Sequence, residues 1–175
     1  MPDVVLKAEH VTKRFGGITA LEDAQLELYK GEVHALVGAN GAGKSTLIKI
    51  ITGAYSSDEG DIYLDGQKVD IKSTFDARAK GISAVYQEFS LINTVSVAEN
   101  IYMGKLLYNN LGPIPRADWK RMNEETQKIL DSLGVKNIKP ETIVGRLSVA
   151  QKQMVEIAKA LSNDLKVLIM DEPTA

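Results

Sequence analysis

Residues 38–45 read Gly38-Ala39-Asn40-Gly41-Ala42-Gly43-Lys44-Ser45 and fit the pattern G-x-x-x-x-G-K-[ST]. An apolar stretch expected to form a strand, residues 32–37, precedes them, and a helix expected over residues 44–52 follows and ends at Gly53. Glycines let backbone N–H groups turn inward, and the N-terminus of a helix adds positive potential. The pattern therefore predicts a phosphate-binding loop, in which Lys44 reaches the β- and γ-phosphates and the Ser45 hydroxyl reaches Mg²⁺. The competing interpretation, a glycine-rich turn that binds nothing, would not require a strand before it and a helix after it.

Short apolar strands surround this loop, and helices dominate the second half of the chain. Strands are expected over residues 4–11, 24–29, 61–64, 67–69 and 82–85, with a turn at Asp65-Gly66 and a short helix capped by Ser73. Helices are expected over residues 96–103, 118–133 and 149–161, with a loop over residues 106–116. The last two helices have expected packing faces formed by Trp119, Met122, Ile129, Leu130 and Leu133, and by Met154, Ile157, Ala158 and Leu161. His10 and His34 are interpreted as strand residues, with His34 buried.

Two acidic residues, Asp171 and Glu172, follow a strand expected to be buried and parallel, residues 167–170. A phosphate loop needs a second contact to Mg²⁺, usually from a carboxylate at the C-terminal end of a neighbouring strand. Asp171 has that place in the sequence, and Glu172 is placed to polarise or deprotonate the water that attacks the γ-phosphate. Alone, Asp-Glu after a strand would more often be a solvated turn. In the same chain as Lys44 and Ser45, the catalytic interpretation is favoured.

The composition excludes several classes of function. The 175 residues carry 21 Lys+Arg against 23 Asp+Glu without a run of five like charges, so no nucleic-acid partner is expected. The absence of cysteine excludes disulfide scaffolds, cysteine nucleophiles and thiolate zinc sites. No apolar stretch approaches the roughly 18 residues of a membrane span, so any membrane role is expected to be peripheral. The sequence contains no Asn-Lys-x-Asp motif, which disfavours a GTPase.

Four segments together carry a resemblance to a known family. They are residues 37–46, Tyr86-Gln87-Glu88, Leu147-Ser148-Val149-Ala150-Gln151 and residues 167–175. On these segments the chain resembles the nucleotide-binding domain of ATP-binding-cassette (ABC) ATPases over essentially its whole length. Residues 147–161 and the helical insert at residues 104–134 are similar to the branch that imports monosaccharides. The resemblance implies an α/β fold of the P-loop NTPase class, with a mixed β-sheet core, an inserted helical lobe and an end after the Walker B strand.

The resemblance also implies the residues of the site. Phe15, 29 residues before Lys44, matches the aromatic that stacks on adenine, and Gln87 matches a glutamine that touches Mg²⁺ or the attacking water. Alone, Phe15 would be an ordinary core or surface residue and Gln87 an ordinary polar residue. The implied nucleotide-binding residues are Phe15, Gly38, Asn40, Gly41, Gly43, Lys44, Ser45, Thr46, Ser148 and Gln151. The implied Mg²⁺ ligands are Ser45, Gln87 and Asp171, and the implied catalytic residues are Lys44, Gln87 and Glu172.

The segment at residues 147–151 resembles the family's signature loop, which in relatives engages the γ-phosphate of ATP on an opposite domain. Ser148 alone also predicts a plain helix cap, and a capped N-terminus is itself an anion site. Ala150 stands where glycine is usual in the family, as it does in several sugar importers. The substitution is expected to remove glycine's freedom at positive φ and to add a methyl group near the phosphate.

We expect one C-terminally incomplete nucleotide-binding domain, with a sheet core at residues 1–87, a helical lobe at 88–161 and a return to the core at 162–175. The loop and the histidine that follow this last strand in the family are absent from the sequence. An unpaired edge of the strand at residues 167–170 is also expected. The chain by itself is therefore expected to bind ATP poorly, to hydrolyse it negligibly and to be marginally stable.

The function that the resemblance implies is ATP hydrolysis, with ATP and Mg²⁺ as cofactors, that drives import of a small carbohydrate at the cytoplasmic face of the membrane. Transmembrane permease subunits, a second nucleotide-binding domain and, indirectly, a solute-binding protein would be the partners. One alternative is an ABC module that binds ATP and dimerises without efficient hydrolysis. The other, a soluble ABC ATPase outside transport, is disfavoured by the near-neutral charge and by the lack of a heptad insert or basic arm.

Overall fold

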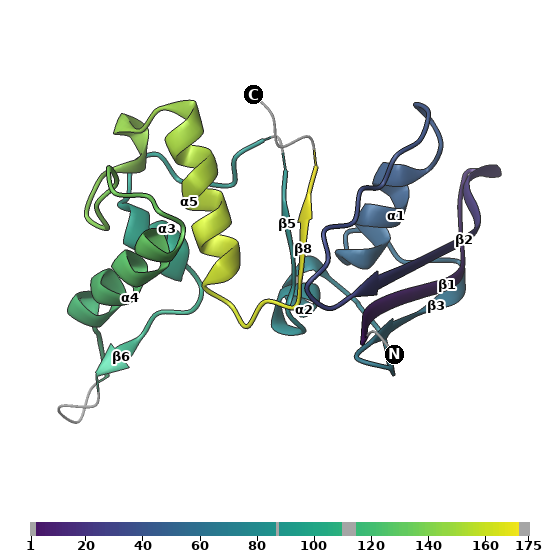
Figure 1. Cartoon of the computed structure of the whole chain (residues 1–175), viewed down its shortest axis with the longest axis horizontal. Helices are drawn as coiled ribbons and strands as arrows, with labels where there is room; N and C mark the ends of the chain where they lie inside the picture. Colours follow the sequence, from purple (N-terminus) through teal and green to yellow (C-terminus); the bar gives the residue numbers. More distant parts are fainter. Residues whose placement is uncertain (1–2, 87, 110–114, 172–175) are drawn as a thin grey trace. The chain divides into compact units, whose positions relative to one another are not determined.

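The computed structural model describes residues 3–86, 88–109 and 115–171, and it divides the chain into two compact units. Unit 1 comprises Met1–Ser83 and Lys166–Ile169, and unit 2 comprises Ala84–Leu165 and Met170–Ala175 (Figure 1). Each unit has a hydrophobic core of its own. The expected division of the chain at residues 87 and 161 stays a prediction.

Unit 1 contains an antiparallel sheet in the order β2-β1-β3-β4. Its strands are β1 (Val4–Phe15), β2 (Ile18–Tyr29), β3 (Glu59–Leu64) and β4 (Gln67–Val69). The predicted hairpin turn joins β3 to β4, because Asp65 and Gly66 both adopt positive φ, at 49° and 75°. β1 and β2 are both longer than the predicted strands. Their ladder is interrupted by several shifts of register, as β-bulges produce.

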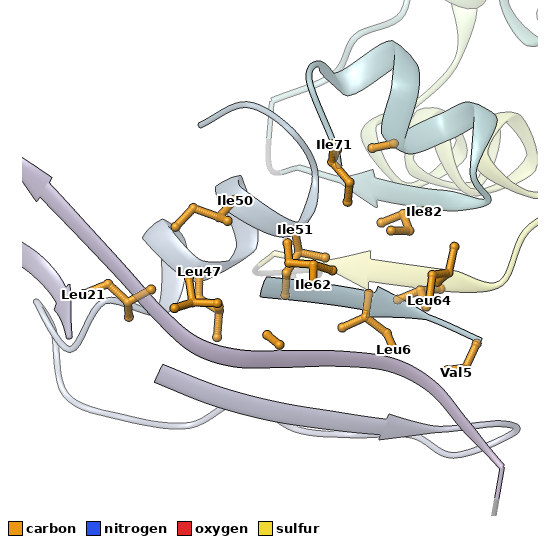
Figure 2. Close-up of a cluster of buried hydrophobic side chains, with 14 residues drawn as sticks. Val5, Leu6, Leu21, Leu47, Ile50, Ile51, Ile62, Leu64, Ile71 and Ile82 are labelled. Atoms are coloured by element: carbon orange, nitrogen blue, oxygen red, sulfur yellow. The ribbon is translucent and has the colours of Figure 1, made fainter. Parts of the chain in front are cut away.

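Two helices of unit 1 begin where the sequence predicts. α1 (Lys44–Ile51) follows the glycine loop, and α2 (Thr74–Ala79) follows Ser73, whose Oγ accepts a hydrogen bond from the Asp76 amide at 3.2 Å. Buried side chains alternate along β3, at Ile62 and Leu64, because successive side chains of a strand point to opposite faces, whereas β1 also buries neighbouring residues, as at Val5 and Leu6. In Figure 2, side chains of α1 gather with those of the sheet, of β5 and of the segment before α2 in one cluster, labelled as Val5, Leu6, Leu21, Leu47, Ile50, Ile51, Ile62, Leu64, Ile71 and Ile82.

The strand predicted before the loop is wrong. Residues 32–39 belong to no strand in the part of the chain that the structure describes, and Val33 and Val37 are 102% and 87% exposed. His34 is exposed too, with its Nδ1 3.4 Å from Glu32 Oε1, so its predicted burial is also wrong. The physical reason is that a strand exists only beside a neighbour that completes its hydrogen-bond ladder, and none of the described strands runs alongside.

β5 (Ile82–Val85) and β8 (Val167–Met170) pair as a two-stranded ladder. The amide of Val167 donates to the Gly81 carbonyl at 3.1 Å, and the amide of Asp171 donates to the Val85 carbonyl at 3.0 Å. The pairing advances in the same direction along both strands, so it is parallel, as predicted. The predicted burial holds only for Val167, because Met170 is 50% exposed and, among the described strands, β8 has a neighbour on one side alone.

Unit 2 is built on three helices, α3 (Val97–Tyr102), α4 (Trp119–Ser132) and α5 (Val149–Leu161) (Figure 1). A 3-10 turn, η1 (Val144–Arg146), precedes α5, and the predicted loop contains a short ladder of β6 (Tyr108–Asn109) and β7 (Arg116–Ala117). α3 opens with a capping box, in which the Ser96 amide donates to Glu99 Oε2 at 2.7 Å and the Glu99 amide donates to Ser96 Oγ at 3.2 Å. The three predicted helices are confirmed.

The packing face of α5 is confirmed at Ala158 but differs from the prediction at its other residues. Val155 and Ala158 are fully buried, whereas Met154, Ile157 and Leu161 are only half-buried. Likewise Trp119, at the first turn of α4, is 49% exposed. The periodic pattern gives the apolar side of a helix, but the neighbouring helices select the residues at its centre. No helix among the described residues is long and apolar enough to cross a membrane.

Candidate nucleotide-binding site

The glycine loop of unit 1 is exposed and leads directly into α1. Gly41 and Gly43 adopt left-handed φ values of 82° and 84°, a conformation that glycine takes without strain. A Cβ on Gly43 would lie 2.7 Å from Leu21 Cδ1 and 2.9 Å from the Ala20 carbonyl oxygen. Position 43 therefore needs glycine both for its backbone conformation and for space against β2.

The N-terminus of α1 has the properties of an anion site. No side chain caps it, and its first turn contains no acidic residue. The first hydrogen bond of the helix runs from the Leu47 amide to the Gly43 carbonyl at 2.9 Å, so the amides of Lys44, Ser45 and Thr46 have no partner one turn earlier in the helix. Such amides, together with the helix dipole, bind phosphate oxygens.

Lys44 folds back over the loop. Its Nζ donates hydrogen bonds to the carbonyl oxygens of Gly38 at 2.6 Å and Ala39 at 2.9 Å. The ammonium group thus holds the loop closed. Phosphate oxygens could replace these two carbonyl oxygens as its hydrogen-bond partners. Ser45 is exposed and Thr46 half-buried, whereas Asn40 lies exposed in the loop.

Phe15 lies at the end of β1 and is 42% exposed, so it is not a core residue. Its ring meets the ring of Tyr55 edge to face, with centroids 5.2 Å apart and planes at 69°. Lys13 Nζ lies 5.5 Å from the centroid of the Phe15 ring. No sequence motif marks Tyr55 as part of this site, because the contact joins residues far apart in the sequence.

A profile of the family described as "ABC transporter" matches residues 21–175. The chain belongs to the ABC transporter family. It is 48% identical over 171 residues to the "Ribose import ATP-binding protein RbsA" of Hahella chejuensis, a match that covers 98% of this chain and 33% of the relative. It is 45% identical over 171 residues to the protein of the same name from Caldanaerobacter subterraneus, covering 98% of this chain and 34% of the relative. The chain thus spans about a third of the length of the curated relatives it matches.

Solved structures confirm the ABC fold. A nucleotide-free ATP-binding cassette from an ABC transporter superposes with a TM-score of 0.81 at 31% identity, covering 98% of this chain and 70% of that one. An ATP-binding cassette of an ABC transporter in its ADP conformation gives the same TM-score, identity and coverage. The predicted α/β fold of the P-loop NTPase class is therefore confirmed.

The segment that resembles the ABC signature loop forms the N-terminus of α5. Ser148 Oγ accepts a hydrogen bond from the Gln151 amide at 3.3 Å, and the Ser148 amide donates to Gln151 Oε1 at 3.0 Å. This capping box confirms the predicted helix cap. The roles of Ser148 and Gln151 toward a nucleotide stay predictions.

Ala150 is the second residue of α5, and its φ is not positive. The expected loss of glycine's freedom at this position is therefore wrong, because a helical backbone suits alanine better than glycine. The methyl group is exposed.

We expect Ala150→Gly to lower the stability of the chain, because glycine is the poorer helix former. A loss of about 0.5–1 kcal/mol in the free energy of unfolding is the usual effect inside a helix. Urea unfolding followed by circular dichroism measures it, with Val149→Gly at the preceding exposed helix position as a comparison. A gain of stability in Ala150→Gly would show that position 150 prefers a non-helical backbone.

Three predicted site residues follow strands of the ABC core. Asp171 comes directly after β8 and is half-buried, with its amide bonded to the Val85 carbonyl. Gln87 and Glu172 lie outside the described residues. Asp171 belongs to unit 2 and the phosphate loop to unit 1, so a shared Mg²⁺ between Asp171 and Ser45 stays a prediction. The described residues contain no group of three His, Asp or Glu residues that could hold a metal ion by themselves.

Proposed function

We propose that this chain binds ATP with Mg²⁺ and forms the ATP-hydrolysing part of an ABC importer for a small sugar. The observation that carries the proposal is the uncapped N-terminus of α1 with Lys44 bonded to the carbonyls of its own loop. Relatives at 45–48% identity are named ribose import ATP-binding proteins, which supports the sugar.

Each residue of the loop has a role that follows from its chemistry. The Lys44 ammonium group exchanges the carbonyls of Gly38 and Ala39 for oxygens of the β- and γ-phosphates, which are stronger partners because they are charged. The phosphates are surrounded by backbone amides, those of Gly41, Gly43, Lys44, Ser45 and Thr46. Gly38 and Asn40 complete the loop. Phe15 stacks on the adenine, a contact that tolerates different bases.

The donor groups present fit Mg²⁺ that is held jointly by protein and nucleotide. Mg²⁺ usually binds through one or two protein ligands, several waters and substrate phosphates, so a site without three clustered carboxylates is the expected kind. Ser45 and Asp171, with Gln87, would supply the protein oxygens. When bound, Mg²⁺ supplies positive charge against the phosphates.

Hydrolysis needs groups that orient the water and offset charge. Glu172 accepts a proton from the attacking water or polarises it, Gln87 orients that water, and Lys44 stabilises the charge on the phosphate oxygens. Ser148 and Gln151 at the N-terminus of α5 contact the γ-phosphate of ATP on a second nucleotide-binding domain, which lies in the same chain of a longer protein or in a dimer.

The partners and the location follow from this proposal. Transmembrane permease subunits would carry the sugar, and a solute-binding protein would deliver it to them. The ATP-binding part would act at the cytoplasmic face of the membrane as a peripheral subunit.

A competition experiment tests the nucleotide site. A fluorescent ATP analogue is titrated onto the chain with Mg²⁺ and displaced by ATP, ADP, AMP or inorganic triphosphate, while phosphate release is followed in the same samples. We expect ATP to compete better than ADP and much better than AMP, because the loop and Lys44 bind the outer phosphates. Equal competition by AMP, or no binding by a chain shown to be folded by circular dichroism, would contradict the proposal.

A further inference from the structure

We propose that Tyr55 and Asp58 are positioning residues for Phe15, and that they fix its ring as a platform for the nucleotide base. The inference deepens the proposed function and rests on it, because it needs a nucleotide whose base meets Phe15. The structural basis is an aromatic contact and a set of bonds that tie the segment after α1 to the end of β1, all within unit 1.

The aromatic pair is exposed although apolar rings favour burial. Phe15 is 42% exposed and Tyr55 37% exposed, and their rings meet edge to face at 5.2 Å. A cation lies near each ring, with Lys13 Nζ 5.5 Å from the Phe15 centroid and Lys49 Nζ 5.3 Å from the Tyr55 centroid. The edge-to-face contact and the nearby cations restrict the two rings, while part of each ring stays exposed to solvent. An exposed and restricted ring of this kind suits stacking on a base.

Asp58 ties this pair to the strand. Its carboxylate accepts hydrogen bonds from Lys13 Nζ at 2.7 Å and from the Arg14 amide at 2.6 Å, and its own amide donates to the Thr12 carbonyl at 2.9 Å. These bonds hold the three residues that directly precede Phe15. The Lys13 side chain is only 13% exposed, so this ion pair is shielded from solvent on the lysine side.

The charge of Asp58 is part of this arrangement. The hydrogen bond from Lys13, and after it the one from the Arg14 amide, hold the pKa of Asp58 below its ordinary value. The carboxylate therefore stays ionised at neutral pH and keeps both oxygens engaged. Next to it, Arg14 Nη1 donates to Glu59 Oε1 at 2.6 Å, a second tie between the same two segments.

Tyr55 is in turn anchored to the helix that begins with the phosphate loop. The amides of Ala54 and Tyr55 donate to the Lys49 carbonyl at 2.8 and 3.0 Å. Tyr55 thus extends from the C-terminal end of α1, while Lys44 lies at its N-terminal end. Phe15 directly precedes Gly16 and Gly17, which both adopt positive φ in the turn between β1 and β2. Contact with Tyr55 therefore gives the ring one orientation instead of several.

The test compares a ligand that has a base with one that lacks it. Binding of ATP and of inorganic triphosphate is measured on the wild-type chain and on Tyr55→Leu, Tyr55→Phe and Asp58→Asn. We expect Tyr55→Leu to weaken ATP binding about tenfold, which lies at the lower end of the range for a base-stacking contact, and to leave triphosphate binding unchanged. Tyr55→Phe should retain ATP binding, because it keeps the ring, and Asp58→Asn should weaken ATP about threefold, because it removes the ion pair to Lys13.

Phe75→Leu is the matched control, since Phe75 is an aromatic of the same unit that is 77% exposed on α2 and is not part of the Phe15–Tyr55 ring pair. It should bind both ligands like the wild type. The inference is overturned if Tyr55→Leu binds ATP like the wild type, or if it weakens ATP and triphosphate equally. Should Tyr55→Leu fail to fold, Asp58→Asn decides by the same comparison of the two ligands.

The same data separate this inference from the proposed function. A wild-type chain that is folded and binds neither ATP nor triphosphate contradicts the ATP site itself, and with it the platform. A wild-type chain that binds both ligands equally well supports the phosphate loop but overturns the platform, because the base would then add nothing.

Discussion

Lys44→Ala is expected to weaken binding of ATP about 100-fold, which corresponds to about 3 kcal/mol. Lys44 is the one cationic residue within residues 38–45, so its loss removes the only side-chain charge that the loop offers to phosphate. Hydrogen bonds to charged groups contribute about 1.5–3 kcal/mol each, and Lys44 makes two in the structure, to Gly38 and Ala39. The variant therefore loses phosphate contacts and the bonds that hold the loop closed. Displacement of a fluorescent ATP analogue measures the change.

Lys72→Ala is the matched control for charge. Lys72 lies in the same unit, its side chain is 78% exposed, and its Nζ lies 3.5 Å from Asp70 Oδ2. Removing it subtracts the same formal charge at a site that has no part in the loop, so ATP binding should change less than about twofold. A similar loss of ATP affinity in both variants would mean that net charge, and not the position of Lys44, determines binding.

Local signals explain why much of the fold follows from the sequence. The helix after the loop, the Asp65-Gly66 turn, the Ser73 cap and the capping box at Ser148 each depend on residues within a few positions of one another. Such signals act wherever the segment is placed. The phosphate loop was predictable for the same reason, since its glycines, its lysine and its helix are contiguous in the sequence.

Features that depend on distant residues were not predictable in this way. Residues 32–37 have the apolar pattern of a strand, yet no described strand lies beside them, and a pattern cannot supply a partner. The centre of the α5 packing face lies at Val155 and Ala158 because of the neighbouring helices. Tyr55 meets Phe15 through a contact between segments far apart in the sequence, and Asp58 ties the same two segments together.

Ala150 shows how a rule about residue type can mislead. The rule that glycine is needed at positive φ is sound, but it applies only where the backbone adopts positive φ. Within α5 the backbone is helical, so alanine is the favourable choice. Gly43, in contrast, combines positive φ with close neighbours, and there the rule holds.

Gly60→Ala is expected to lower the free energy of unfolding by about 4 kcal/mol, at the upper end of what single substitutions do. Gly60 is the second residue of β3 and has a φ of 87°, and a Cβ there would lie against backbone atoms of β1, 2.5 Å from the Glu9 carbonyl oxygen. The neighbouring strand cannot yield easily, because β1 is irregular at this point. His10 adopts a φ of 52°, and the register between β1 and β3 shifts between Glu9 and Thr12. The substitution therefore adds backbone strain and displaces β1, one of the two inner strands of the sheet.

Gly66→Ala separates these two effects. Gly66 also has positive φ, at 75°, but a Cβ at this position would meet nothing within 4 Å. It should lower the free energy of unfolding by about 1 kcal/mol, the cost of a left-handed backbone at a non-glycine residue. Urea unfolding followed by far-ultraviolet circular dichroism measures both variants. Equal losses at the two positions would mean that backbone conformation alone accounts for the effect at Gly60. The larger loss expected at Gly60 would show that the close contact of β3 with β1 adds to it.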